Sequence, residues 1–154
     1  MLIFDEIITG IGRTGRMFAC EHEGVEPDLL CVAKGLSGGY LPLGATLATD
    51  EIEQAFCGEV NENRTLYHGH TYTGNALACA AALASLDLCE ATDLIGHINA
   101  GSVIIADRLG ALRDTGQYPH VLDVRQRGLT IDERRGLAFD TEALAVHRAY
   151  WSAR

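Results

Sequence analysis

A lysine and an aspartate stand at the ends of two short apolar runs. Lys34 follows the run LLCVA at residues 29–33 and is itself followed by Gly35, while Asp5 follows the run LIF at residues 2–4. Each run has the length and composition of a buried strand, and the carboxyl ends of strands in an open α/β sheet border the crevice where ligands bind. Burial at that edge would disfavour the ammonium form of Lys34, and an uncharged lysine amine attacks carbonyl carbons to form a Schiff base.

Asp5 supplies the group that such chemistry requires beside the lysine. A pyridoxal ring withdraws electrons only while its ring nitrogen stays protonated, and a buried carboxylate next to that nitrogen keeps the proton in place. Plainer alternatives stand beside both assignments. Lys34 could be a surface lysine that extends its amine to water at a strand end, and Asp5 and Glu6 could simply cap the turn after a strand.

The elements that would position these residues alternate along the chain. Apolar runs predict strands, and apolar residues at helical spacing predict two long helices, the first rich in alanine. This alternation predicts an α/β fold with a mainly parallel sheet flanked by helices. The expected strands cover about 2–5, 29–33 and 44–49, the short helices 17–23 and 50–56, and the long helices 75–90 and 93–114, before a turn at 116–119 leads toward 121–124.

Three segments follow one another in the order and spacing of a known family. They are DEIITGIGRTG from Asp5, CVAKGLSGGYLPLGATLAT from Cys31 and YHGHTYTGNALACAAAL from Tyr67. Together they resemble the class III pyridoxal-phosphate-dependent aminotransferases. The resemblance implies the large domain of a fold-type I transferase, with pyridoxal 5'-phosphate held by Lys34 as an internal aldimine. It also implies that Asp5 pairs with the pyridine nitrogen and that Lys34, once released from the cofactor, acts as a general base.

Thr71 is the third residue that the resemblance singles out. In similar enzymes the threonine of this loop reaches the cofactor phosphate of the neighbouring subunit, which implies a homodimer whose site is shared between two chains. The loop leads into the alanine-rich helix expected near Asn75, and free N–H groups at a helix N-terminus favour a phosphate. Capping of that helix by Thr71 or Thr73 is the plainer alternative.

Within the class, the segments FACEHEGVEPDLL and HGHTYTGNALACA most resemble the branch that serves biotin biosynthesis. That branch converts 8-amino-7-oxononanoate to 7,8-diaminononanoate with an amino donor that is adenosylmethionine or lysine. The alternative within the class is an aminotransferase for an omega-amino or diamine substrate. A non-catalytic pseudo-enzyme is an alternative of a different kind.

The glycines Gly10, Gly12 and Gly15 spell G-x-G-x-x-G shortly after the first expected strand, which makes a nucleotide-binding module a further alternative. In a dinucleotide-binding unit the strand runs directly into the first glycine and the next strand ends in an acid. Here residues 5–9 intervene and the next strand ends in Lys34. A turning loop with positive φ at its glycines is the better account.

The resemblance divides the chain into residues 1–129, a partial pyridoxal-phosphate-binding large domain, and residues 130–154, a divergent or truncated C-terminal segment. A family strand would begin at residue 2 with nothing before it, so the sequence is expected to be a fragment truncated at both ends of that domain. Such a fragment is expected to fold poorly or to associate through exposed strand edges, and it could be inactive alone. Residues 142–151 could form an amphipathic helix.

Composition excludes several function classes. The chain has 154 residues, 47% of them hydrophobic, and a net charge of −9, which disfavours nucleic acid as a partner. No apolar run is long enough to span a membrane, and the pair His68 and His70 has no third ligand, so neither a membrane nor a metal is expected. The odd number of cysteines without a C-x-x-C motif suits a reducing, cytoplasmic setting; they are Cys20, Cys31, Cys57, Cys79 and Cys89.

Overall fold

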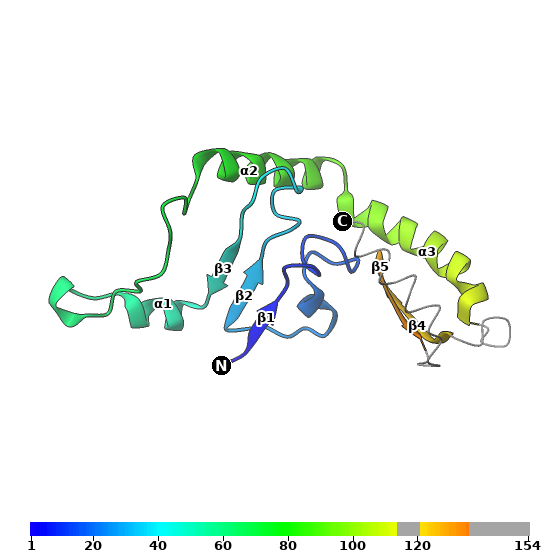
Figure 1. Cartoon of the computed structure of the whole chain (residues 1–154), viewed down its shortest axis with the longest axis horizontal. Coiled ribbons are helices and arrows are strands. Elements are labelled where there is room, and N and C mark those ends of the chain that lie inside the picture. The colour runs from blue at the N-terminus through cyan, green and yellow to red at the C-terminus, as the bar shows by residue number, and fades with distance from the viewer. Residues whose placement is uncertain (114–120, 136–154) are drawn as a thin grey trace, which may run out of the picture. The chain divides into compact units, whose positions relative to one another are not determined.

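The computed structural model describes residues 1–113 and 121–135 (Figure 1). These residues form two compact units. The first comprises Met1–Ser102 together with Arg127–Thr130, and it contains every residue that the sequence singles out as a candidate for chemistry. The second comprises the described residues of Val103–Gln126 and Ile131–Arg154. The helix suggested for residues 142–151 lies outside the described residues.

A three-stranded sheet is the centre of the first unit, in the order β1-β2-β3 (Figure 1). Its strands are β1 (Ile3–Asp5), β2 (Leu29–Val32) and β3 (Ala45–Ala48). β1 and β2 are parallel, with Ile3 opposite Leu29 and Asp5 opposite Cys31. The three strands therefore form where the sequence predicts them, each one to two residues shorter than expected.

The sheet is mixed, which corrects the expectation of a mainly parallel one. β3 runs antiparallel to β2, with Leu29 opposite Ala48 and Val32 opposite Ala45. A parallel neighbour needs a crossover connection that is usually helical. The link between β2 and β3, residues 33–44, consists of turns, so the chain reverses direction instead of crossing over.

The helices lie close to their expected positions. The segment 17–23 forms only a short 3₁₀ helix, Ala19–His22, whereas α1 (Asp50–Phe56) has the expected bounds. A second short 3₁₀ turn covers Val60–Glu62. The long helices are α2 (Ala76–Ala91) and α3 (Leu94–Arg113).

Alanines form the inward face of α2. Ala78 and Ala82, one turn apart, are buried, whereas Leu77 and Leu83 are exposed. The turn after β2 lies close to this helix, because a Cβ placed on Gly38 would come within 3.4 Å of the Ser85 hydroxyl. The small side chains thus let α2 approach the rest of the unit, as its composition predicts.

After α3 the chain forms a two-stranded sheet of β4 (Val121–Arg127) and β5 (Thr130–Arg135). The start of β4 is predicted from the sequence, whereas β5 is not. No helix in the described part of the chain is long and apolar enough to cross a membrane.

Candidate active site

The structure brings Lys34 and Asp5 to the same edge of the sheet. Asp5 is the last residue of β1 and pairs in register with Cys31 of β2. Lys34 comes three residues after Cys31, just beyond the end of β2, so at 3.3 Å per residue it is at most about 10 Å along the chain from the partner of Asp5. Because β1 and β2 are parallel, the two charged residues share one carboxyl edge.

Asp5 is exposed, so the expectation of a buried carboxylate is wrong for this chain. Its Oδ1 accepts a hydrogen bond of 3.0 Å from the N–H of Ile7, which is the turn-capping role considered as an alternative. Its Oδ2 has no partner among the described residues. One oxygen is therefore bonded to the backbone, and the other is available to accept a hydrogen bond from a ligand.

The buried carboxylate at this strand end belongs to Glu6, which is only 3% exposed. Its two oxygens accept hydrogen bonds from the Thr9 hydroxyl and, at 2.9 Å, from the backbone N–H of Cys20. Neighbouring residues of a strand point to opposite sides, so only one of Asp5 and Glu6 could face the edge where ligands bind. The alternation does not say which of the two turns inward; the contacts of Glu6 with Thr9 and Cys20 decide it.

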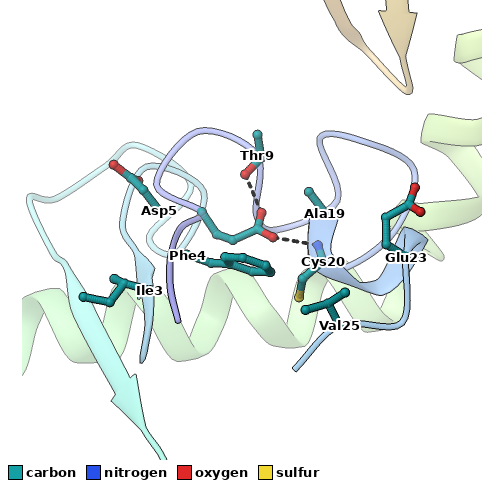
Figure 2. Close-up of a pocket in the computed structure, with 9 residues that line it drawn as sticks. Ile3, Phe4, Asp5, Thr9, Ala19, Cys20, Glu23 and Val25 are labelled. Atoms are coloured by element: carbon teal, nitrogen blue, oxygen red, sulfur yellow. Dashed lines mark hydrogen bonds between the residues drawn. The ribbon is translucent and has the colours of Figure 1, made fainter. Parts of the chain in front are cut away.

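A hollow of about 360 Å³ lies beside β1 (Figure 2). It is lined by Ile3, Phe4, Asp5, Glu6, Thr9, Ala19, Cys20, Glu23 and Val25. Figure 2 shows the Asp5 carboxylate pointing away from Thr9 and Cys20, whose hydrogen bonds converge on the buried carboxylate. The Glu6 carboxylate thus binds Thr9 and Cys20 of the following loop, whereas the Asp5 carboxylate points away from them.

Lys34 is exposed, so the burial expected for it is also not present in this chain. It is the only lysine of the sequence, which has eleven arginines besides. The turn that follows is well defined, because the N–H of Leu36 donates to the carbonyl of Ala33 at 2.8 Å and the buried Ser37 hydroxyl donates to the carbonyl of Leu41 at 2.5 Å. The backbone around the amine is fixed while the amine itself is accessible.

Thr71 lies in an exposed loop before α2, and it has no hydrogen-bond partner among the described residues. The loop is closed by its neighbours instead, since the Thr73 hydroxyl accepts from the N–H of His70 at 2.9 Å. Neither threonine caps the helix. Asn75 does so, with its side-chain oxygen accepting from the N–H groups of Leu77 and Ala78 at 3.0 and 3.2 Å.

This cap changes the expectation about phosphate. Two of the N–H groups at the start of α2, those of Leu77 and Ala78, are already bonded to Asn75. The free N–H groups that the sequence analysis expects there are therefore fewer than supposed. The Thr71 hydroxyl is an accessible donor in this loop, without a hydrogen-bond partner among the described residues.

The glycine loop does not have the geometry of a dinucleotide-binding unit. Gly12 and Gly15 have φ of +88° and +89°, and residues 7–17 form turns and bends that lead to a 3₁₀ helix rather than directly into an α-helix. A phosphate-binding fingerprint needs a helix N-terminus immediately after the glycines. The glycines instead permit the turning loop that the sequence analysis favours.

Among the described residues, no group of three or more histidine, cysteine, aspartate or glutamate side chains could hold a metal ion. His70 has a local role, since its Nδ1 accepts from the N–H of Tyr72 at 3.1 Å. All five cysteines are free. Burial, together with the carboxylates of Glu6 and Glu21, raises the pKa of the Cys20 thiol, which disfavours a nucleophilic role for it.

Comparison with known proteins identifies the family. The model of the family described as aminotransferase class III matches residues 1–134. The chain belongs to the class III aminotransferases. The matched residues include Asp5, Lys34 and the loop around Thr71.

Among curated relatives, the adenosylmethionine-8-amino-7-oxononanoate aminotransferase of Nitratidesulfovibrio vulgaris is 46% identical over 99% of this chain and 29% of its own length. The enzyme of that name from Aquifex aeolicus is 47% identical over 90% of this chain and 31% of its own length. The chain thus spans about three tenths of the curated relatives that it matches.

Solved structures agree with the fold. The crystal structure of adenosylmethionine-8-amino-7-oxononanoate aminotransferase from Methanocaldococcus jannaschii has a TM-score of 0.81 at 46% identity, covering 91% of this chain and 32% of that one. A taurine:2-oxoglutarate aminotransferase from Bifidobacterium kashiwanohense, solved in complex with PLP and glutamate, has a TM-score of 0.77 at 31% identity, covering 92% of this chain and 30% of that one. The predicted fold, the large domain of fold-type I transferases, is confirmed.

Proposed function

We propose that this chain supplies the cofactor-binding lysine and the ring-nitrogen carboxylate of a pyridoxal-phosphate-dependent aminotransferase that converts 8-amino-7-oxononanoate to 7,8-diaminononanoate. The observation that carries the proposal is the placement of Lys34 and Asp5 at one carboxyl edge of the parallel pair β1 and β2. The reaction follows the names of the relatives at 46% and 47% identity.

The residues at this edge fit pyridoxal phosphate. When bound, this cofactor supplies an electron-withdrawing ring that acidifies the substrate carbon bearing the amine. Asp5 has one oxygen fixed by the Ile7 N–H and one without a partner among the described residues. The free oxygen can accept a hydrogen bond from a protonated ring nitrogen, and the negative charge of the carboxylate keeps that proton on the nitrogen.

Lys34 has two roles in this proposal. Its amine is accessible and stands on a fixed turn, so it can bind the cofactor carbonyl covalently. Once released from the cofactor, the amine would stay at the same edge, where it could accept a proton from the substrate carbon and later donate it again. The same side chain would thus first bind the cofactor and then transfer the proton.

We extend the proposal to a homodimer in which Thr71 serves the site of the partner subunit. Thr71 lies in an exposed loop and has no hydrogen-bond partner among the described residues. The side chains around it are also exposed, with Tyr67 at 88% and Tyr72 at 75%. A hydroxyl and two aromatic rings left exposed on one loop support a role toward another chain, since aromatic side chains are enriched at interfaces.

The proposal is tested by adding pyridoxal phosphate to the purified chain and recording the visible absorbance. We expect an absorbance band from the adduct, and we expect borohydride to remove it. The product 7,8-diaminononanoate should abolish the band faster than taurine or ornithine does. Lys34→Arg, which keeps the charge, is the matched control and should lose the band that the Lys34 adduct gives. A folded chain without a band contradicts the cofactor assignment, whereas a band discharged equally by all three amines contradicts the substrate.

A further inference from the structure

The glycine loop contains a residue in a conformation that its type rarely adopts. Ile11 has φ of +55° and is buried, with 9% of its surface exposed. A β-branched side chain at positive φ is uncommon and persists only where the surroundings hold it there, and such residues cluster at functional sites. The proposed cofactor site does not by itself account for this isoleucine.

Several contacts hold the loop around Ile11. The N–H of Gly10 donates to the carbonyl of Glu6 at 2.9 Å, and that of Gly12 donates to the carbonyl of Met17 at 3.2 Å. A Cβ placed on Gly12 would lie 2.8 Å from Cδ1 of Ile98, so the loop backbone packs directly on α3. The loop is therefore held by backbone hydrogen bonds and by packing on α3.

This support presses Ile11 onto the residue next to Lys34. A Cβ placed on Gly35 would lie 2.6 Å from Cβ of Ile11, 3.0 Å from its Cγ1 and 3.2 Å from its Cγ2. Only glycine fits there without displacing the loop. The branched part of the isoleucine thus lies against Gly35, the residue that follows Lys34.

We propose that Ile11 is a positioning residue for Lys34. Its side chain, held by a loop that starts directly after Asp5, fixes the Gly35 backbone and with it the direction in which the Lys34 amine enters the site. The contact links the two strand ends that carry the proposed chemistry. This inference rests on the proposed function for its purpose, but the contact itself is testable without it.

The test uses the full chain and two measurements on each variant. The first is hydrogen–deuterium exchange of the Leu36 amide, whose bond to the Ala33 carbonyl spans the Lys34–Gly35 unit. The second is the rate at which pyridoxal phosphate adds to Lys34. Exchange at Cys31, in the centre of the sheet, is recorded to detect a general loss of stability.

Ile11→Gly removes the side chain and tolerates positive φ, so we expect both Leu36 exchange to rise and adduct formation to slow by about tenfold or more, with Cys31 unchanged. Gly35→Ala should do the same because its Cβ collides with Ile11. In the double variant both measurements should return toward the wild-type values. The alanine at position 35 fills the gap left by Ile11→Gly, and the glycine at position 11 removes the clash made by Gly35→Ala. Ile11→Val keeps the three atoms that face Gly35 and should retain wild-type behaviour.

Asn63→Gly is the matched control, since Asn63 also has positive φ, at +53°, but lies after α1. It should change neither measurement. If Ile11→Gly does not fold, Ile11→Asn replaces it, because asparagine tolerates this backbone conformation.

The inference is overturned if Ile11→Gly and Gly35→Ala leave Leu36 exchange and adduct formation unchanged, or if the double variant is no better than the single ones. A wild-type chain that forms no adduct at Lys34 contradicts the proposed function, and the exchange at Leu36 then still decides whether Ile11 fixes the turn.

Discussion

Among single residues, the adjacent carboxylates of Asp5 and Glu6 at the end of β1 have different roles. Glu6 is buried and fully engaged by Thr9 and the Cys20 N–H, so it ties the glycine loop to the strand. Asp5 is exposed and keeps one oxygen without a partner in the described part of the chain. The first residue stabilises the edge and the second is available for a ligand.

Asp5→Asn should weaken cofactor binding without disturbing the turn. The amide oxygen can still accept from the Ile7 N–H, but the charge that would hold a ring proton is gone. We expect the dissociation constant for pyridoxal phosphate to rise about tenfold, equivalent to about 1.4 kcal/mol. Absorbance titration measures it; an unchanged constant would show that Asp5 does not meet the ring nitrogen.

Cys20 should react slowly with alkylating reagents at neutral pH. Alkylation requires the thiolate, and burial with the nearby Glu6 and Glu21 carboxylates raises the pKa of this thiol, so its reaction profile should be displaced to higher pH. Labelling with iodoacetamide is followed across pH by mass spectrometry. We expect the labelling of Cys20 to set in at a higher pH than that of the exposed Cys57.

Glu21→Gln is the control for this displacement. The glutamine oxygen can keep the hydrogen bond of 2.9 Å that Glu21 accepts from the Phe18 N–H, while the negative charge near the thiol is lost. The profile of Cys20 should then move to lower pH. Coincident profiles for Cys20 and Cys57 in the wild-type chain would contradict the assignment.

The sequence was sufficient to place Asp5 and Lys34 at one edge, because apolar runs mark strands and both residues end such runs. It was not sufficient to assign burial. Which of Asp5 and Glu6 turns inward depends on residues 9–20 returning over β1, a tertiary contact with no local pattern. The contact of Ile11 with Gly35 is equally invisible, since an isoleucine at positive φ contradicts local preference.

At the scale of elements, α2 begins with a single side chain that satisfies two backbone groups. Asn75→Ala should lower the free energy of unfolding by about 1 kcal/mol, because the N–H groups of Leu77 and Ala78 lose their acceptor. Asn75→Asp keeps the acceptor and should stay within about 0.5 kcal/mol of wild type. Urea unfolding followed by circular dichroism measures both; equal losses would show that the cap is not the cause.

Element positions were largely predictable because the apolar periodicity of the strands and long helices is strong, and α1 has the expected bounds. The capping residue was predicted wrongly as Thr71 or Thr73, whereas Asn75 caps α2; the preference for asparagine at a helix start was the signal that could have identified it. The direction of β3 was not. It depends on whether residues 33–44 form a crossover, and the tight turn after Lys34 reverses the chain instead.

At the scale of the whole molecule, much apolar surface is exposed in the described residues. Ile3 is 53% exposed on β1, whose second edge pairs with no described strand, and Leu77 and Leu83 of α2 are 74% and 65% exposed. Unpaired strand edges and apolar patches favour association. We therefore expect the purified chain to associate as its concentration rises.

Ile3→Lys should reduce that association, because a charged residue on an edge strand opposes pairing with another chain. Size-exclusion chromatography with light scattering over a range of concentrations measures the effect. Glu51→Lys, at an exposed site on α1, changes the charge by two units against one for Ile3→Lys and serves as the control. A wild-type chain that stays a monomer at every concentration would contradict the prediction.

The central claim is that Lys34 is the residue that binds the cofactor, and the sequence makes it directly measurable. Lys34 is the only lysine, so the α-amine of Met1, which pairs with Asp28 at 3.6 Å, is its one competitor among primary amines. The chain is incubated with pyridoxal phosphate, reduced with borohydride and mapped by peptide mass spectrometry. We expect the reduced adduct on the peptide that contains Lys34; an adduct confined to Met1, or none on a folded chain, would contradict the assignment of Lys34.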